Sequence, residues 1–234
     1  MVKKYPKQGD DMKNDSTSLN QHEKQFLIDQ LKKMGLGDKR VHYHKIWAVE
    51  EGKKFQNRIK DYLQQDILAL VVNFVDILAH KSSQMDVLKE MVPDESGYRT
   101  AVRSWLNHSW LLQVLKKLSE NNFTVILTSD HGSIRVQRDV MVAADREASS
   151  GVRYKYGRNL NTKEKNAIVI KEPEKFRLPV FGPQPSYIVA KDDVYFIYPN
   201  QAHKYQSKFK NSFQHGGVSM EEMMVPVAIM KGRG

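Results

Sequence analysis

The stretch FTVILTSDHG, residues 123–132, decides the fold class of this chain. Its first half is rich in β-branched and aromatic residues and predicts a buried strand, while its second half places Asp130 beside His131 where that strand should end. A second apolar run, residues 67–75, is interrupted by one asparagine and is followed at once by Asp76. Continuous apolar runs of this kind are typical of parallel strands that helices cover on both faces.

Helical patterns separate these strands. Apolar residues recur at helical spacing over residues 26–34, and a long helix over residues 105–118 is expected to have one apolar face made by Leu106, Trp110, Val114 and Leu118. The alternation of strands and helices predicts an α/β fold, namely a doubly wound, mostly parallel sheet with helices on both faces.

The second half of the chain has a different pattern. Residues 132–165 are polar and basic without a clear period, which predicts an insertion outside the sheet. The stretch YIVAKDDVYFIYP, residues 187–199, is interpreted as a hairpin of two strands. The segment of residues 215–230 then predicts a short helix, capped by Ser219 and Glu222, and a last strand.

Composition limits the class of protein. Lys and Arg number 37 against 27 Asp and Glu, a formal charge of +10, which favours anionic ligands such as phosphorylated compounds or nucleic acid. The absence of cysteine excludes disulfides and thiolate metal sites. No apolar segment is long enough to cross a bilayer, so we expect a cytoplasmic protein without a membrane partner. Residues 1–18 are polar and are expected to be a linker or disordered lead-in, and residues 19–234 to form one domain.

Five side chains have the chemistry of metal ligands. Asp76 and His80 are four residues apart and therefore share one face of a helix, Asp130 and His131 follow a predicted strand, and His215 precedes two glycines. Taken singly, Asp76 with His80 is more often a helix cap beside an exposed histidine, and the other two sites are as often a polar turn and a loop histidine without a ligand. Because ligands of open α/β sheets bind beyond the carboxyl ends of the strands, we predict that the five converge on divalent metal.

Several motifs in this order resemble the PglZ domain, a branch of the alkaline phosphatase superfamily. The motifs are NFVDILAH, TSDHG, RYKYGRN and FQHGGVSMEEMMVP, and the resemblance covers essentially the whole chain. It is close to the PglZ modules of PorX-type response regulators, which follow a receiver domain. The resemblance implies two divalent metals, usually zinc, with Asp76, His80 and His215 on one ion, and Asp130 and His131 in part of the second set. Manganese or iron also suits such ligands.

The chain departs from the superfamily at its start. In that superfamily, the second ion is also held by an aspartate and by a Thr or Ser nucleophile, both from elements earlier in the chain. Residues 1–18 contain Asp, Thr and Ser, but no strand precedes them and no helix start presents a hydroxyl beside a metal. We expect a carboxyl-terminal fragment of a PglZ domain that lacks the nucleophile; genuine loss of the catalytic half is the alternative. In either case the isolated chain would bind one metal or none, and would be inactive or weak.

The resemblance implies a metal-dependent phosphoesterase that cleaves a phosphodiester of a nucleotide or short oligonucleotide, downstream of a receiver domain in a two-component response regulator. Arg153 and Lys155, in RYKYGRN, are expected to contact the substrate. Whether the protein forms a homodimer is left open.

Two other functions are alternatives. The first alternative is a non-catalytic signalling module that binds protein or nucleic acid and uses metal as a structural staple. The second is a metal-free nucleic-acid binder with steep salt dependence.

Overall fold

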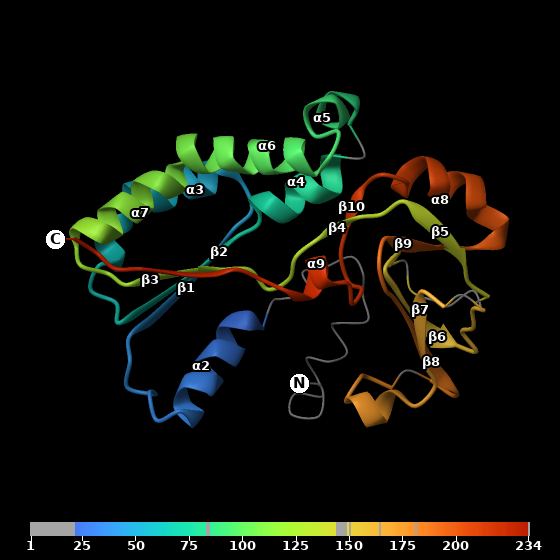
Figure 1. Cartoon of the computed structure of the whole chain (residues 1–234). Coiled ribbons are helices and arrows are strands. Elements are labelled where there is room, and N and C mark those ends of the chain that lie inside the picture. Colours follow the sequence, from blue (N-terminus) through green and yellow to red (C-terminus); the bar gives the residue numbers. More distant parts are fainter. Residues whose placement is uncertain are drawn as a thin grey trace.

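A computed structural model of the chain confirms the α/β class (Figure 1). The predicted lead-in, residues 1–18, lies outside the residues that the structure describes. Those are residues 22–82, 85–143, 149, 151–163, 165–180 and 182–233.

Strands and helices alternate from α2 to α4, after which a run of helices and then a run of strands follow. The helices are α2 (Glu23–Lys33), α3 (Val49–Asn57), α4 (Phe74–Ser82), α5 (Asp86–Met91), α6 (Glu95–His108), α7 (Trp110–Glu120), α8 (Ala202–Phe209) and α9 (Met220–Met223). The strands are β1 (Val41–Ile46), β2 (Ile67–Val72), β3 (Val125–Thr128), β4 (Ile134–Arg135), β5 (Arg138–Met141), β6 (Tyr154–Arg158), β7 (Ala167–Ile170), β8 (Pro185–Ala190), β9 (Val194–Ile197), β10 (Phe213–Gln214) and β11 (Val227–Met230).

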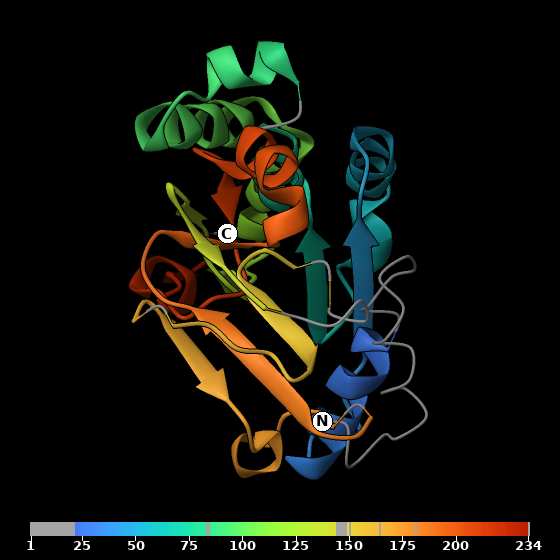
Figure 2. The ribbon, with the colours of Figure 1, turned by 90° about the vertical axis from the view of Figure 1, so that its right-hand side faces the viewer.

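In the first half of the chain, strands pack beneath a layer of helices. β1 and β2 pair in parallel, and α3, α6 and α7 lie on one side of them, with α2 on the other (Figures 1 and 2). Phe55 of α3 and Val114 of α7 are buried in the cluster that joins the two layers. The helix predicted over residues 105–118 is two helices, because Ser109 has extended backbone and separates α6 from α7.

Gly52 allows α3 and α7 to approach closely. A Cβ atom at this position would lie 2.0 Å from Cε2 of the buried Trp110 ring. Gly52→Ala is therefore expected to lower the free energy of unfolding by about 1–3 kcal/mol, since overpacking against a rigid ring outweighs the gain in helix propensity. Urea denaturation measures this change, and Lys53→Ala, at an exposed position on the same helix, is the control. A stabilised Gly52→Ala variant would contradict this packing.

The strands of the first half belong to two separate pairs, one of which includes β11 from the end of the chain. β2 pairs with β1 and β3 pairs antiparallel with β11, and within the described residues no hydrogen-bond ladder joins β2 to β3. Leu70 of β2 and Val125 of β3 nevertheless pack against the same buried cluster. On the second pair, Ile126 is 63% and Ile229 is 65% exposed. Within the described residues, β2 and β3 thus each have one edge without a partner strand, and the β3–β11 pair exposes apolar side chains.

The second half of the chain differs from the predicted hairpin. β8 pairs antiparallel with β6 and β7, whereas β9 pairs in parallel with β5. All four residues of β9 are buried, so this strand lies in the interior and takes its hydrogen bonds from β5. The ladders of the described residues are thus spread over small sheets, parallel in two pairs and antiparallel in the others, instead of one mostly parallel sheet.

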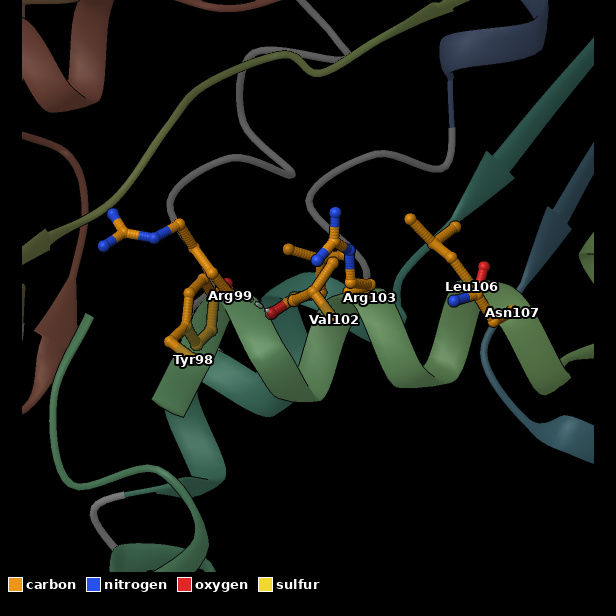
Figure 3. A pocket seen from close by; sticks show the side chains of 7 residues that line it. Tyr98, Arg99, Val102, Arg103, Leu106 and Asn107 are labelled. Atoms are coloured by element: carbon orange, nitrogen blue, oxygen red, sulfur yellow. Dashed lines mark hydrogen bonds between the residues drawn. The ribbon is translucent and has the colours of Figure 1, made fainter. Parts of the chain in front are cut away.

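Helix α6 borders an open cavity (Figure 3). Asp94 caps the helix by accepting a hydrogen bond of 2.8 Å from the Gly97 amide. The cavity has a volume of about 360 Å³ and is lined by Val75, Tyr98, Arg99, Val102, Arg103, Leu106 and Asn107.

Among the described residues, no helix has the length and apolar character needed to traverse a bilayer.

Candidate metal centre

Helix α4 holds Asp76 and His80 on one face. The helix starts at Phe74, directly after β2, so Asp76 lies in its first turn and not at the end of the strand. The Phe74 ring stacks on Trp105 of α6 with centroids 4.2 Å apart, which fixes the start of α4. The Nε2 atom of His80 lies 3.4 Å from Oδ1 of Asp76, as the four-residue spacing predicts.

His215 reaches the same place from the far end of the sequence. It follows β10, which pairs with β4, and the Phe213 ring stacks on Tyr98 of α6 at 4.5 Å. Gly216 has φ of +104°, a left-handed conformation that glycine adopts without strain. The Nε2 atom of His215 lies 3.3 Å from Oδ1 of Asp76 and 2.9 Å from Nε2 of His80. The two histidines, 135 residues apart in the chain, are therefore brought together.

His131 joins this group from the loop after β3. Its Nδ1 atom lies 3.0 Å from the Gly132 carbonyl oxygen, which can only accept a hydrogen bond. Nδ1 therefore carries the proton, and the lone pair of Nε2 is available to a ligand. The His131 ring stacks on His215 with centroids 4.0 Å apart.

Gly132, the glycine of TSDHG, allows its loop to pack closely against α9. The Gly132 amide donates a hydrogen bond of 2.9 Å to the Glu222 carbonyl. A Cβ atom at Gly132 would lie only 1.9 Å from the Glu221 carbonyl oxygen, so the loop can pass this close to α9 only without a side chain. The close approach holds the loop that carries His131.

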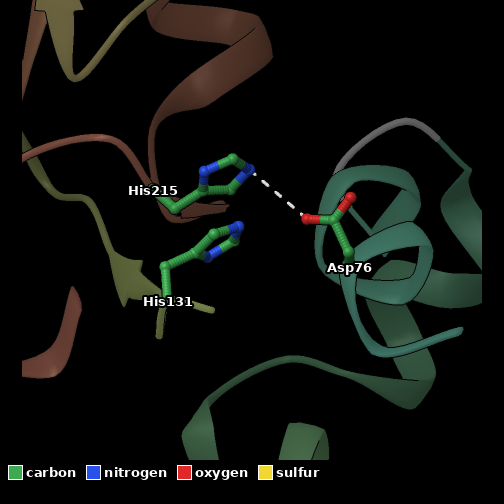
Figure 4. Close-up of side chains that lie close together, drawn as sticks. All are labelled: Asp76, His131 and His215. Carbon is green, nitrogen blue, oxygen red and sulfur yellow. Dashed lines mark ion pairs between the residues drawn. The ribbon is translucent and has the colours of Figure 1, made fainter. Parts of the chain in front are cut away.

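The donor atoms fit a divalent ion. One ligand atom each from Asp76, His131 and His215 lies within 4.8 Å of the other two (Figure 4). Donors bound to one tetrahedral zinc ion at about 2 Å lie roughly 3.3 Å apart, close to the separations of Asp76 Oδ1 from His215 and His80. Oδ1 of Asp76 is buried without a hydrogen-bond partner among the described residues, and contacts of 3.3–3.4 Å are long for such bonds. A cation would satisfy this oxygen.

The charges of the group are coupled. Contacts with His215, and then with His80, hold the pKa of the Asp76 carboxyl well below its usual range, although burial opposes the shift. The same carboxylate raises the pKa of His80. Asp76 is therefore ionised at neutral pH and supplies a negative charge to the centre.

Asp130 lies at the edge of this group. Its side chain is 86% exposed, and its Oδ1 atom lies 3.9 Å from Nε2 of His131. The carboxylate also accepts a hydrogen bond of 3.1 Å from the His131 amide, so it orders the loop. Asp130 is connected to the other ligand candidates through His131.

The structure corrects the predicted role of Arg153 and Lys155, because both side chains are completely buried. The Arg153 guanidinium pairs with the Glu222 carboxylate, at 2.9 Å from Nε to Oε1, and also donates to the Val194 carbonyl. Lys155 donates to the Ser149 carbonyl at 3.1 Å and lies over the Tyr198 ring. Burial lowers the pKa of Lys155 to about 8. Neither side chain presents its charge to a ligand.

Sequence patterns did not reveal the residues around the α6 cavity. Tyr98 donates a hydrogen bond of 3.1 Å to the Val75 carbonyl, next to Asp76, and thereby connects α6 to the centre. Arg99 and Arg103 are one helical turn apart. That four-residue spacing of basic residues in a capped amphipathic helix was the available signal, but it is also common on solvated faces.

Comparisons with known proteins agree with the fold and the motifs. The model of the family described as "BREX system PglZ alkaline phosphatase-like domain" matches residues 4–230. No curated protein matches the chain. Among solved structures, murine ectonucleotide pyrophosphatase/phosphodiesterase 5 is similar with a TM-score of 0.51 and 16% identity, over 78% of this chain and 52% of that one. The chain thus spans about half the length of that structure, and the likeness concerns the fold alone. The chain belongs to the PglZ family of alkaline phosphatase-like domains.

Proposed function

We propose that the chain is part of a metal-dependent phosphoesterase that acts on phosphodiesters of nucleotides or short oligonucleotides. The observation that carries the proposal is the convergence of Asp76, His80, His131 and His215, with the buried Asp76 Oδ1 lacking a hydrogen-bond partner within the described part of the chain. Family membership supports phosphoester chemistry. The net charge of +10 favours a polyanionic substrate.

Asp76, His80 and His215 would hold one divalent ion, with zinc the element that suits these ligands best. His131, with Asp130 beside it, would contribute to a second ion. When bound, such ions polarise a phosphoryl oxygen and offset charge that develops on the phosphorus centre. The protein's part is to hold Asp76 ionised and to orient the His131 ring through the bond between its Nδ1 atom and the Gly132 carbonyl.

We further propose that the catalytic unit includes a segment upstream of these residues, which supplies the nucleophile and an additional aspartate. Two observations support this, because an added strand would cover both: within the described residues β2 and β3 each have one edge without a partner strand, and the β3–β11 pair exposes apolar residues. The PglZ modules that the motifs resemble suggest that a receiver domain precedes this segment.

The test compares this chain with a version extended upstream into its natural gene. Metal content is measured by elemental analysis after dialysis, and hydrolysis is measured with bis(p-nitrophenyl) phosphate and with oligonucleotides. We expect bound zinc in both proteins and turnover in the extended protein. Bound metal without turnover on any phosphoester would instead support a non-catalytic module stapled by metal, and absence of metal from both proteins would refute the proposal.

A further inference from the structure

The cavity beside α6 adjoins the candidate metal centre. Val75 lines it and is the neighbour of Asp76 on α4. Tyr98 lines it as well, and its hydroxyl donates a hydrogen bond to the Val75 carbonyl. A ligand in the cavity would therefore lie within reach of a group bound at the centre.

Two guanidinium groups stand at this cavity on successive turns of α6. Arg99 and Arg103 extend from the same side of the helix, and Asn107 continues the row (Figure 3). Both arginines are exposed. Neither makes an ion pair or hydrogen bond in the described part of the chain, unlike the buried Arg153. Their charges are thus available to a ligand.

The row is held rigidly relative to the metal centre. The Trp105 ring stacks on Phe74 at the start of α4, and the Tyr98 ring stacks on Phe213, two residues before His215. Stacked aromatic pairs at both places fix the register of α6 against the elements that carry the metal-ligand candidates. The arginines therefore act from a fixed support, as recognition of an extended ligand requires.

The chemistry of the cavity selects a chain of phosphates. Guanidinium forks bind phosphate oxygens in bidentate fashion, and the two α-carbons are separated by about 6 Å along the helix axis, which suits two groups of one extended polyanion. Val102 and Leu106 supply an apolar wall beside the charges. A volume of about 360 Å³ lies at the small end of the range for ligand cavities, enough for one nucleotide unit.

We propose that Arg99 and Arg103 form a subsite for the non-reacting phosphates of an oligonucleotide strand whose neighbouring phosphodiester lies at the metal centre. This inference rests on the proposed function and narrows its substrate class to a polyanionic chain in preference to a mononucleotide. The subsite lies on α6, outside the group of metal-ligand candidates.

The test measures binding of a short fluorescein-labelled oligothymidylate by anisotropy in the presence of EDTA, so that neither metal nor turnover contributes. We expect the Arg99→Gln/Arg103→Gln variant to bind about 10-fold to 100-fold more weakly, and the slope of log K against log salt concentration to fall by about 1.4. Thymidine monophosphate, as an unlabelled competitor, should be affected less.

The matched control is Lys53→Gln/Lys116→Gln, which removes the same charge at exposed positions on α3 and α7. Its affinity should stay within about twofold of wild type. Equal losses in the two double variants would overturn the subsite. Because Gln is a good helix former and the arginines are exposed, the thermal unfolding temperature should be unchanged. Each single arginine variant should also bind more weakly, with about half the change in salt slope. If the protein binds no metal but the arginine substitutions still weaken oligonucleotide binding, the subsite stands although the metal proposal fails.

Discussion

Replacing His215 with alanine is expected to lower the affinity for zinc about 100-fold or more. His215 places Nε2 3.3 Å from Oδ1 of Asp76 and 2.9 Å from Nε2 of His80, so its loss removes one of three converging donors. Changes in groups that only support a ligand cost 10-fold to 100-fold in metal affinity, so removal of a direct ligand should cost at least the upper end of that range.

Competition with a chromophoric chelator measures this affinity at a fixed neutral pH, because protons compete with metal for imidazole ligands. His203→Ala is the matched control, because His203 is an exposed histidine on α8, in the same half of the chain as His215. We expect the control to bind zinc like wild type. Unchanged affinity in His215→Ala would remove this ligand from the centre and, with it, the proposed phosphoesterase.

The convergence of the candidate ligands could be predicted from local patterns. A strand followed by Asp-His-Gly, and a carboxylate four residues before a histidine, are short-range signals that survive without knowledge of tertiary contacts. The order of the motifs, through its resemblance to the PglZ domain, indicated that these residues belong to one metal centre. By contrast, no local pattern indicated that His131 would stack on His215, because that contact depends on how β10 and β4 pair.

Long-range contacts explain why the predicted roles of Arg153 and Lys155 and the predicted hairpin were wrong. Arg153 and Lys155 have the composition of a basic surface loop, yet they are buried, because a partner 69 residues away compensates the charge of Arg153 and aromatic rings surround that of Lys155. The β8–β9 turn likewise looks like a hairpin locally, but β9 is completed by β5. Long-range pairing overrides local signals in both cases.

The buried pair of Arg153 and Glu222 predicts the largest loss of stability. Among the described residues, Arg153→Met would leave the interior Glu222 carboxylate with only two donors, the amides of Gly217, at 2.8 Å, and Ser219, at 3.0 Å. Removing one partner of a buried ion pair costs about 3–5 kcal/mol. We therefore expect the free energy of unfolding, measured by urea denaturation, to fall by about this amount.

A surface pair provides the control for Arg153→Met. Arg58 and Asp61 are 2.9 Å apart with exposed side chains, so Arg58→Met should cost less than about 1 kcal/mol. Combining Arg153→Met with Glu222→Gln should restore part of the stability, because the amide keeps an acceptor for the backbone without a buried charge. Losses from the two single substitutions that simply add in the double variant would show that the pair is not coupled.

The same pair should shift the acid limit of the fold. Burial opposes ionisation of Glu222, but the hydrogen bonds and charge of Arg153 outweigh it and lower the pKa below the usual value. A carboxyl whose pKa is lower in the folded state contributes stability above its unfolded pKa of about 4.3, and that contribution is lost as pH falls through the folded pKa. In Arg153→Met only the Gly217 and Ser219 amides still oppose the effect of burial among the described residues. The pKa of Glu222 therefore rises, and the variant should begin to unfold at a higher pH than wild type. Circular dichroism across an acid titration measures both midpoints, and coincident midpoints would show that Arg153 does not hold Glu222 ionised.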